Sequence, residues 1–351
     1  MDHDPTAPVA AAATPEELGA RIFAWRRGFN AMHLIDLGLQ CGLFEALARH
    51  PGLTSDALAA QLGLHAPYVR TWCTTAYSLA LLEAEGDALR LAPHVDTVLA
   101  DVRHPRHLGG YVQLGTQFAT DDYRAAAEGL RTGARVPFQG RSPAFAEVIA
   151  RALAGVNLMV ARKVLPSIAP LAAVLNGGGT LLEVGCGSGR LLLQLARTFP
   201  QAQLLGVDID PTGLAAARSA IADAGLQARV RVVEGELRSV ATPGAADAVL
   251  MVEVLHEIDA PIRPPLLAAC AAALKPGGWL VIADETYPGN WDEARQAPFR
   301  FPLQTGLEEM MWGNVVPTRA EQERLLREAG FGGAIERSLF GEGFTLLVTR
   351  R

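Results

Sequence analysis

One short stretch, residues 181–190, constrains the fold of this chain more than any other part of its sequence. Residues 180–182 (Thr-Leu-Leu) are apolar enough for a buried strand, and residues 190–196 have the apolar spacing of a helix. Three glycines at alternate positions lie between them: Gly185, Gly187 and Gly189. A strand that runs through a glycine turn into a helix presents free backbone N–H groups, so this stretch predicts a ligand-binding turn.

Two carboxylates near this turn indicate what kind of ligand it binds. Glu183 lies two positions before the first glycine, where a cationic ligand has a use for it and an anionic pyrophosphate has none. Asp208 ends a second predicted strand, Gln203–Asp208, about 20 residues after the turn, where such units place an acid that binds ribose. The spacing G-x-G-x-G also differs from the dinucleotide fingerprint G-x-G-x-x-G. The pattern indicates a ligand with a ribose and a positive charge.

From residue 180 onward, strand-like and helix-like segments alternate, which is typical of a largely parallel sheet. The predicted strands are Thr180–Val184, Gln203–Asp208, Val230–Glu234, 248–252 and 279–283, and the predicted helices are 211–224, 261–274 and 319–329. Residues 275–278 (Lys-Pro-Gly-Gly) are expected to form a turn before the fifth strand. Two final strands, 334–339 and 344–349, are expected to form a hairpin whose last strand is antiparallel. The pattern predicts an α/β fold.

The run Glu183-x-Gly185-x-Gly187-x-Gly189 resembles motif I of the class I S-adenosylmethionine-dependent methyltransferases. Residues 253–257 (Glu-Val-Leu-His-Glu) and 274–278 (Leu-Lys-Pro-Gly-Gly) resemble a narrower group, the dimeric small-molecule O-methyltransferases of the caffeate and hydroxyindole type. The resemblance covers essentially the whole ordered chain. It implies a Rossmann-like seven-stranded methyltransferase sheet with a mainly helical, winged-helix N-terminal domain.

The resemblance implies S-adenosyl-L-methionine as the cofactor and S-adenosyl-L-homocysteine as its product. The cofactor would lie over Gly185, Gly187 and Gly189, with Glu183 near its methionine amino group and Asp208 on its ribose hydroxyls. Residues 234–236 (Glu-Gly-Glu) stand where methyltransferases usually have Gly-Asp after the third strand. Glu236 would therefore face the adenine.

The resemblance also implies that His256, just past the fourth strand, is the general base. A hydroxyl becomes a good nucleophile as its proton leaves, and histidine titrates in the range that this step needs. His256 stands in a His-Glu pair with Glu257, and the family carboxylate that orients the base matches Asp284, with Glu285 beside it. One of these two acids is expected to point at His256. The alternative for His256 is a partly buried side chain that bonds backbone in a loop.

The sequence departs from the plant enzymes after this point. They carry a second orienting acid shortly before the Thr that starts the next helix, whereas residues 312–317 (Trp-Gly-Asn-Val-Val-Pro) before Thr318 contain none. Glu308 and Glu309 lie upstream, at positions that the motif does not assign. The missing acid leaves open a non-methylating reaction of the same fold, such as hydroxylation, decarboxylation or pericyclic rearrangement. Methylation of carbon or nitrogen is open as well.

The sequence predicts four regions: a disordered tail (1–15), a winged-helix dimerisation domain (16–100), a helical linker region (101–176) and the methyltransferase domain (177–351). The broad apolar set of the first helix indicates packing against another chain or domain, and the resemblance implies a homodimer. A winged helix can also bind DNA. However, residues 54–94 hold two arginines against four acids, and a DNA reader needs basic residues for phosphates.

Composition excludes several other classes. The 351 residues carry a net charge of −6, which favours neither nucleic acid nor an anionic membrane as a partner. The four cysteines are far apart in the sequence, which argues against a zinc site or a disulfide framework and fits a reducing cytoplasm. No apolar run reaches spanning length. We expect no metal.

A small-molecule acceptor is the expected partner, and residues 286–317 are the candidate binding segment. This long, aromatic and methionine-containing stretch suits a lid or a pocket for an apolar planar molecule, although a core helix is the alternative. Phe118, Met159 and Met251 could complete such a pocket, although each taken singly is better explained as core. The acceptor class that follows is aromatic or polyketide-like, bound between the two domains.

Overall fold

The structure, a computed structural model, describes residues 13–104, 106–137, 140–341 and 343–351. The chain divides into two compact units: the first comprises residues 1–124 and 141–155, and the second comprises residues 125–140 and 156–351. The predicted disordered tail lies outside the described residues as far as residue 12, and Pro15 already begins a helix. Residues 101–176, predicted as one linker region, are divided between the two units.

The first unit begins with a long capped helix, α1 (Pro15–Gln40). The Thr14 hydroxyl accepts a hydrogen bond from Glu17 N–H, while the Glu17 carboxylate accepts one from Thr14 N–H. This reciprocal cap satisfies two N–H groups that a helix leaves open at its start. Several apolar side chains of α1, among them Ile22 and Phe23, are more than half exposed within this unit. Their exposure supports the expected homodimer, which stays a prediction.

Residues 54–91, within the predicted winged-helix region, form two helices and a two-stranded hairpin. They are α3 (Ser55–Leu62), α4 (Ala66–Ser78), β1 (Leu82–Glu85) and β2 (Ala88–Leu91), preceded by α2 (Leu43–Arg49). Thr54 caps α3 with its hydroxyl, and Gly63 ends it in the left-handed conformation. Trp72 of α4 packs edge to face against Phe44 of α2, so the hairpin and helices share one core.

Residues 109–111, two glycines and a tyrosine, form part of a helix, although paired glycines are typical of a loop. They belong to α5 (Gly109–Gln113), which continues through η2 (Leu114–Ala119) into α6 (Thr120–Thr132). The reason is packing: a Cβ on Gly110 would lie 2.6 Å from the backbone of Arg151 and Ala152 in α7 (Pro143–Ala152). Gly110 therefore allows two helices to approach closely, and it does not mark a turn.

The second unit contains the predicted seven-stranded mixed sheet, with the order β5-β4-β3-β6-β7-β9-β8. Its strands are β3 (Thr180–Val184), β4 (Gln203–Asp208), β5 (Val230–Glu234), β6 (Ala246–Val252), β7 (Leu274–Asp284), β8 (Glu336–Phe340) and β9 (Phe344–Arg350). The first five are parallel, and β9 runs antiparallel to both β7 and β8. Residues 275–278 belong to β7 and do not form a separate turn, because Leu274 already pairs with Ala246 across an irregularity.

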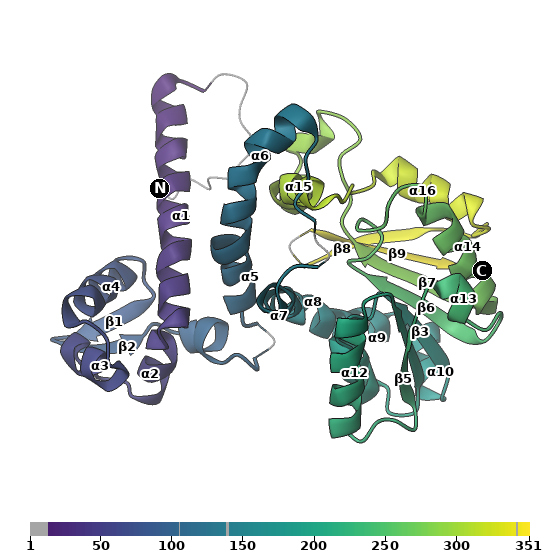
Figure 1. The fold of residues 1–351 in the computed structure, drawn as a ribbon, viewed down its shortest axis with the longest axis horizontal. Helices are drawn as coiled ribbons and strands as arrows, with labels where there is room; N and C mark the ends of the chain where they lie inside the picture. The colour runs from purple at the N-terminus through teal and green to yellow at the C-terminus, as the bar shows by residue number, and fades with distance from the viewer. Residues whose placement is uncertain (1–12, 105, 138–139, 342) are drawn as a thin grey trace. The chain divides into compact units, whose positions relative to one another are not determined.

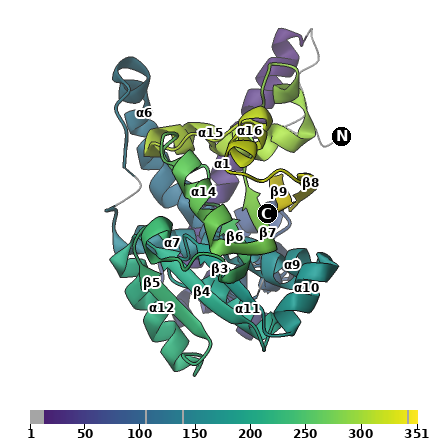
Figure 2. The ribbon, with the colours of Figure 1, turned by 90° about the vertical axis from the view of Figure 1, so that its right-hand side faces the viewer.

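Helices cover both faces of this sheet (Figures 1 and 2). One face packs against α10 (Ala169–Asn176), α11 (Arg190–Thr198) and α12 (Pro211–Asp223), and the other against α13 (Leu237–Val240), α14 (Arg263–Ala273) and α16 (Arg319–Glu328). Strands covered on both faces read as continuous apolar runs, as β3 and β4 do. The carboxyl ends of the parallel strands meet at one edge, where α/β proteins bind ligands.

Several further elements complete the described chain. They are η1 (Asp96–Ala100), α8 (Ala154–Met159), η3 (Val160–Val164), α9 (Leu165–Ser167), η4 (Glu293–Arg295), η5 (Ala297–Phe299) and α15 (Arg300–Trp312). Among the described residues, no single helix has both the length and the apolar character needed to cross a membrane. Two pairs of helices meet that criterion only when each pair is taken together across a bend.

Candidate active site

The glycine loop after β3 has a backbone conformation that residues other than glycine rarely adopt. Gly185, Gly187 and Gly189 have φ angles of +72°, +46° and +71°. Gly189 caps the start of α11, so the loop delivers backbone N–H groups to a helix N-terminus, as predicted. A Cβ on Gly185 would lie 2.5 Å from a methyl group of Val254, whereas a Cβ on Gly187 would meet nothing within 4 Å. Gly187 therefore borders open space.

Asp208 is bound to this loop. Its Oδ2 accepts a hydrogen bond of 2.7 Å from Gly187 N–H, and its Oδ1 accepts one of 2.9 Å from Asp210 N–H. These contacts hold the end of β4 beside the loop. The structure thus brings the predicted ribose acid and the predicted glycines together.

Glu183 lies under the same loop and is 4% exposed. Its Oε2 is buried and has no hydrogen-bond partner among the described residues. Burial, and then the neighbouring charge of Asp208, raise the pKa of this carboxyl well above its ordinary value. An unsatisfied buried carboxyl is costly. A cationic group of a ligand would satisfy it, so the residues here fit the predicted cofactor.

Glu236 lies near the end of β4, but its carboxylate is paired with a neighbouring arginine. It is the residue before α13, and its Oε2 is 2.6 Å from Arg238 Nε on the surface. Gly235 N–H donates to the Asp208 carbonyl, which places this turn beside the end of β4. The role of Glu236 toward adenine stays a prediction.

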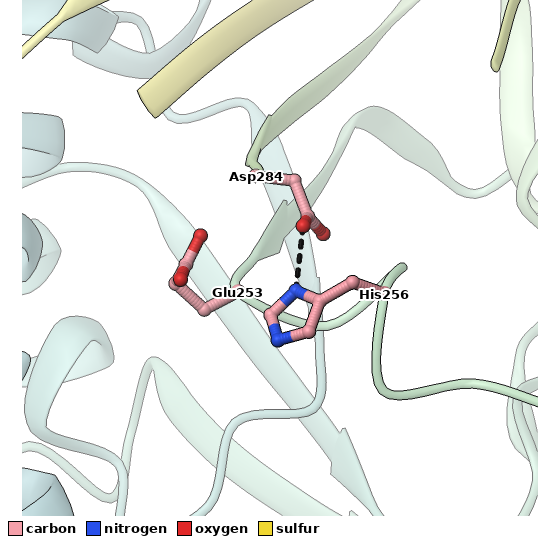
Figure 3. Close-up of side chains that lie close together, drawn as sticks. All are labelled: Glu253, His256 and Asp284. Atoms are coloured by element: carbon pink, nitrogen blue, oxygen red, sulfur yellow. Dashed lines mark hydrogen bonds and ion pairs between the residues drawn. The ribbon is translucent and has the colours of Figure 1, made fainter. Parts of the chain in front are cut away.

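His256 and Asp284 form a buried pair at the ends of β6 and β7 (Figure 3). His256 Nδ1 lies 2.6 Å from Asp284 Oδ1, and the two side chains are 3% and 1% exposed. Asp284 Oδ2 also accepts hydrogen bonds from the N–H groups of Val254 and Leu255, at 3.2 and 2.7 Å. Because a carboxylate accepts at Nδ1, that nitrogen carries the proton and Nε2 is left as the basic atom.

Glu285 does not contact His256. Its two carboxylate oxygens each lie 3.2 Å from the Thr305 hydroxyl, which donates to them, and its carbonyl accepts from Gln322 Nε2. Burial is the main cause that raises the pKa of Glu285, to about 7. Of the two acids considered from the sequence, Asp284 is the one placed to orient His256.

A second carboxylate reaches His256 from α15, contrary to the expectation that this acid is missing. Glu309 Oε2 lies 3.5 Å from His256 Nε2. Asn314 holds it: Asn314 Nδ2 donates to Glu309 Oε2 at 2.7 Å, and Asn314 N–H donates to the Glu309 carbonyl at 2.8 Å. Gly313, with a φ of +103°, ends α15 and folds Asn314 back. In the sequence, a glycine after a helical run was the only signal that the chain turns here and holds Glu309 at the site.

Two opposing effects set the basicity of His256. Burial alone lowers its pKa, whereas the charge and hydrogen bond of Asp284, with smaller effects of Glu253 and Glu309, raise it. The pairing prevails, because the 2.6 Å contact stabilises the imidazolium directly. The pKa of His256 therefore lies well above its ordinary value.

Arg263 fixes the loop that carries His256, a role that the sequence did not indicate. Its side chain is 1% exposed and donates to the carbonyls of Ile258 and His256, at 2.8 and 3.2 Å, and to that of Val315. One guanidinium thus joins the loop after β6 to the segment after α15.

Glu253 was also missed as a site residue. A carboxylate oxygen of Glu253, a ring nitrogen of His256 and a carboxylate oxygen of Asp284 all lie within 4.8 Å of one another. Such a set can ligate a cation. Here both oxygens of Asp284 already accept hydrogen bonds from backbone and His256, which favours a hydrogen-bonded pair over a metal centre.

The segment 286–317, the candidate binding segment, is only partly a loop. Met311 and Trp312 of α15 are buried, while Trp291 is 90% exposed, so these side chains do not share one pocket. Met251 is fully buried in the core of the sheet. The alternative prediction, a core helix, describes the C-terminal half of this segment.

Comparison with known proteins gives a family and several relatives. Residues 181–278 match the family model described as a methyltransferase domain. The chain is 28% identical to 3-hydroxy-5-methyl-1-naphthoate 3-O-methyltransferase of Streptomyces sahachiroi, over 83% of each chain. It is 35% identical to ubiquinone biosynthesis O-methyltransferase of Xanthomonas campestris pv. campestris, over 30% of this chain and 43% of that protein.

Two solved structures share the fold over nearly their whole length. Human N-acetylserotonin methyltransferase in complex with S-adenosylmethionine matches with a TM-score of 0.77 and 20% identity, covering 98% of this chain and 99% of that one. Mitomycin 7-O-methyltransferase matches with a TM-score of 0.73 and 21% identity, covering 95% and 98%.

Proposed function

From the premise that this chain is an S-adenosylmethionine-dependent methyltransferase of the small-molecule O-methyltransferase type, we propose that His256 is its general base. The proposed acceptor is a hydroxyl group of a small aromatic or polyketide-like natural product. Two proteins that the chain resembles support this acceptor class, because they are named as O-methyltransferases of a naphthoate and of mitomycin.

The observation that carries the proposal is the pairing of His256 with Asp284 at 2.6 Å. Asp284 holds the ring with its proton on Nδ1, so Nε2 can accept the hydroxyl proton of the acceptor. The imidazolium that forms is stabilised by the same carboxylate. Glu309, on the Nε2 side, adds to this stabilisation and has to share that nitrogen with the acceptor.

The cofactor is S-adenosylmethionine, which supplies an electrophilic methyl group on a sulfonium. We propose that Glu183 binds its amino group, that Asp208 binds its ribose, and that the backbone of Gly185, Gly187 and Gly189 lies against it. The unpartnered Oε2 of Glu183 and the open space at Gly187 support this placement. Holding the acceptor hydroxyl at His256 and the cofactor at this loop would supply rate through proximity.

Mass spectrometry tests this function. The purified protein would be incubated with S-adenosylmethionine and a panel of phenolic and polyketide-like hydroxy compounds. We expect S-adenosylhomocysteine together with an acceptor heavier by one methyl group, which fragmentation places on oxygen. A methyl group on carbon or nitrogen, or an acceptor changed without S-adenosylhomocysteine, would overturn the O-methylation proposal.

His256→Ala tests the role of the base. We expect turnover to fall by about a hundredfold or more, because a general base contributes 10²–10⁴-fold. Affinity for S-adenosylmethionine, measured by calorimetry, should stay unchanged. His50→Ala, which removes an exposed imidazole from the other unit, is the matched control and should keep full turnover. Unchanged turnover in His256→Ala would exclude the role.

A further inference from the structure

The backbone at Glu253 is unusual for its residue type. Glu253 follows β6 with a φ of +55°, in the left-handed region, which side chains with a Cβ seldom adopt. Its N–H donates to the Ala283 carbonyl at 2.9 Å, so the strained turn is fixed to the neighbouring strand β7. This turn places the Glu253 side chain beside the ring of His256 (Figure 3). Strain of this kind is concentrated at functional sites.

The Glu253 carboxyl differs from the other acids around His256. Asp284, Glu285 and Glu309 each accept a hydrogen bond from a named side chain or backbone group. Glu253 Oε1 is buried and has no hydrogen-bond partner among the described residues. The residue as a whole is only partly buried. A buried oxygen without a partner, beside the base, is suited to a polar atom of the acceptor.

The surroundings of Glu253 favour its neutral form. Burial is the main cause that raises its pKa well above the ordinary value, and Asp284, Glu285 and Glu309 add to the rise, while His256 opposes it. A protonated carboxyl donates a hydrogen bond, which a carboxylate cannot do.

We propose that Glu253 is a specificity-determining residue that donates a hydrogen bond to a carbonyl oxygen of the acceptor, ortho or peri to the hydroxyl that is methylated. This inference rests on the proposed O-methylation at His256. The geometry supports it, because a carboxylate oxygen of Glu253 lies within 4.8 Å of one ring nitrogen of His256, which places the carboxyl beside the proposed base. Two groups at that separation can address two oxygens on neighbouring positions of one ring system.

The internal hydrogen bond of such acceptors explains why a donor at Glu253 would assist the reaction. In an ortho or peri hydroxycarbonyl compound, the hydroxyl proton is held in an internal hydrogen bond to the carbonyl. That proton then points away from an external base. A second donor that occupies the carbonyl oxygen frees the hydroxyl to donate to His256 Nε2. Glu253 would therefore exchange one internal hydrogen bond for two bonds to the protein.

The test compares two acceptors and two variants. The acceptors are matched sets of hydroxyaryl ketones, one with hydroxyl and carbonyl ortho or peri and the other with them para. Glu253→Met removes the donor at similar size, and Glu253→Gln keeps an N–H donor. We expect kcat/KM of the wild type to favour the adjacent isomers at least tenfold, since an unmade buried hydrogen bond costs that much. We expect Glu253→Met to lose this preference and Glu253→Gln to keep most of it.

The outcomes separate this inference from the proposed function. A wild type that methylates both sets on oxygen, with no preference or the opposite preference, would overturn the role of Glu253 and leave O-methylation standing. Retention of the wild-type preference by Glu253→Met would overturn that role as well. A wild type that forms no methyl ether from any acceptor would contradict the proposed function itself. Circular dichroism and calorimetric affinity for S-adenosylmethionine show that each variant is folded.

Discussion

At the scale of single residues, the site is defined by which carboxylate meets which atom of one imidazole. Asp284 lies on Nδ1 and fixes the proton there, while Glu309 lies on Nε2, the side where the proposed acceptor would bind. Asn314 keeps Glu309 in that position. His256 is thus supported from one strand and one helix, and both acids raise its pKa. This pairing makes the pH dependence of the reaction a test of the geometry.

We expect the pH profile of kcat/KM to rise with pH through an apparent pKa above 6.5, the ordinary value for histidine. The sign follows because only neutral His256 accepts a proton, and a raised pKa keeps it protonated to higher pH. Glu309→Gln keeps an oxygen for Asn314 but removes the charge, so its profile should rise at lower pH. Glu308→Gln, one residue earlier on the same helix, is the control. Coincident profiles for Glu309→Gln and the wild type would contradict the contact at Nε2.

At the scale of elements, the glycine loop between β3 and α11 has one position that faces protein and one that faces open space. A Cβ on Gly185 would lie 2.5 Å from Val254, in the loop that leads to His256, whereas Gly187 has no neighbour within 4 Å of that position. The loop therefore couples the cofactor region to the loop of His256 at Gly185. It presents bare backbone at Gly187.

Two alanine substitutions separate these roles. Gly187→Ala should cost about 1–2 kcal/mol of folding free energy, the penalty for an L-residue in the left-handed region, and should weaken binding of S-adenosylmethionine at least tenfold. Gly185→Ala should cost about 1–3 kcal/mol more, because its methyl also clashes with Val254. Urea unfolding and calorimetric titration measure both. Gly187→Ala with wild-type affinity would show that the cofactor does not lie on this loop.

Some elements could be predicted from the sequence to the residue, and others could not. β3, β4 and β5 are short apolar runs between polar or glycine residues, and the structure confirms their bounds. The role of Gly110 could not be predicted, because a glycine that permits helix packing looks the same in sequence as one that makes a turn. His256 and Asp284 followed from motif positions at strand ends.

Glu309 and Glu253 did not follow from the sequence, since their placement depends on backbone geometry that no periodicity records. Glu309 reaches the site because Gly313 ends α15 and turns Asn314 back. Glu253 reaches the site because its own backbone has the left-handed conformation. A missing acid in the linear motif was replaced in space by one from a different element.

At the scale of the whole molecule, the buried acids around His256 make folding depend on pH. The pKa of Glu285 rises from an ordinary 4.5 to about 7 in the fold. Below 4.5 the carboxyl is protonated in both states. Between the two values the unfolded chain loses the proton that the folded protein keeps. The free energy of unfolding therefore falls as pH rises from 4.5 through about 7, by on the order of 3 kcal/mol in all.

Glu285→Gln carries no titrating proton and isolates this effect. We expect the free energy of unfolding of the variant, relative to that of the wild type, to increase by on the order of 2–3 kcal/mol from pH 5 to pH 8. Urea unfolding at both pH values measures this difference. Glu293→Gln, which changes a partly exposed acid after β7, is the control and should show no such change. Equal pH dependence of Glu285→Gln and the wild type would show that Glu285 ionises normally in the fold.

The antiparallel strand β9 has a consequence for how the protein is made. It lies between β7 and β8 in the sheet, and its partner β7 carries Asp284 at its end. During translation, β7 emerges about 60 residues before β9, and its outer edge has no strand to pair with until Phe344–Arg350 has left the ribosome. The strand that orients His256 is therefore locked into the sheet late in synthesis, and a ribosome stalled before residue 344 would display an unpaired edge to chaperones or to other nascent chains.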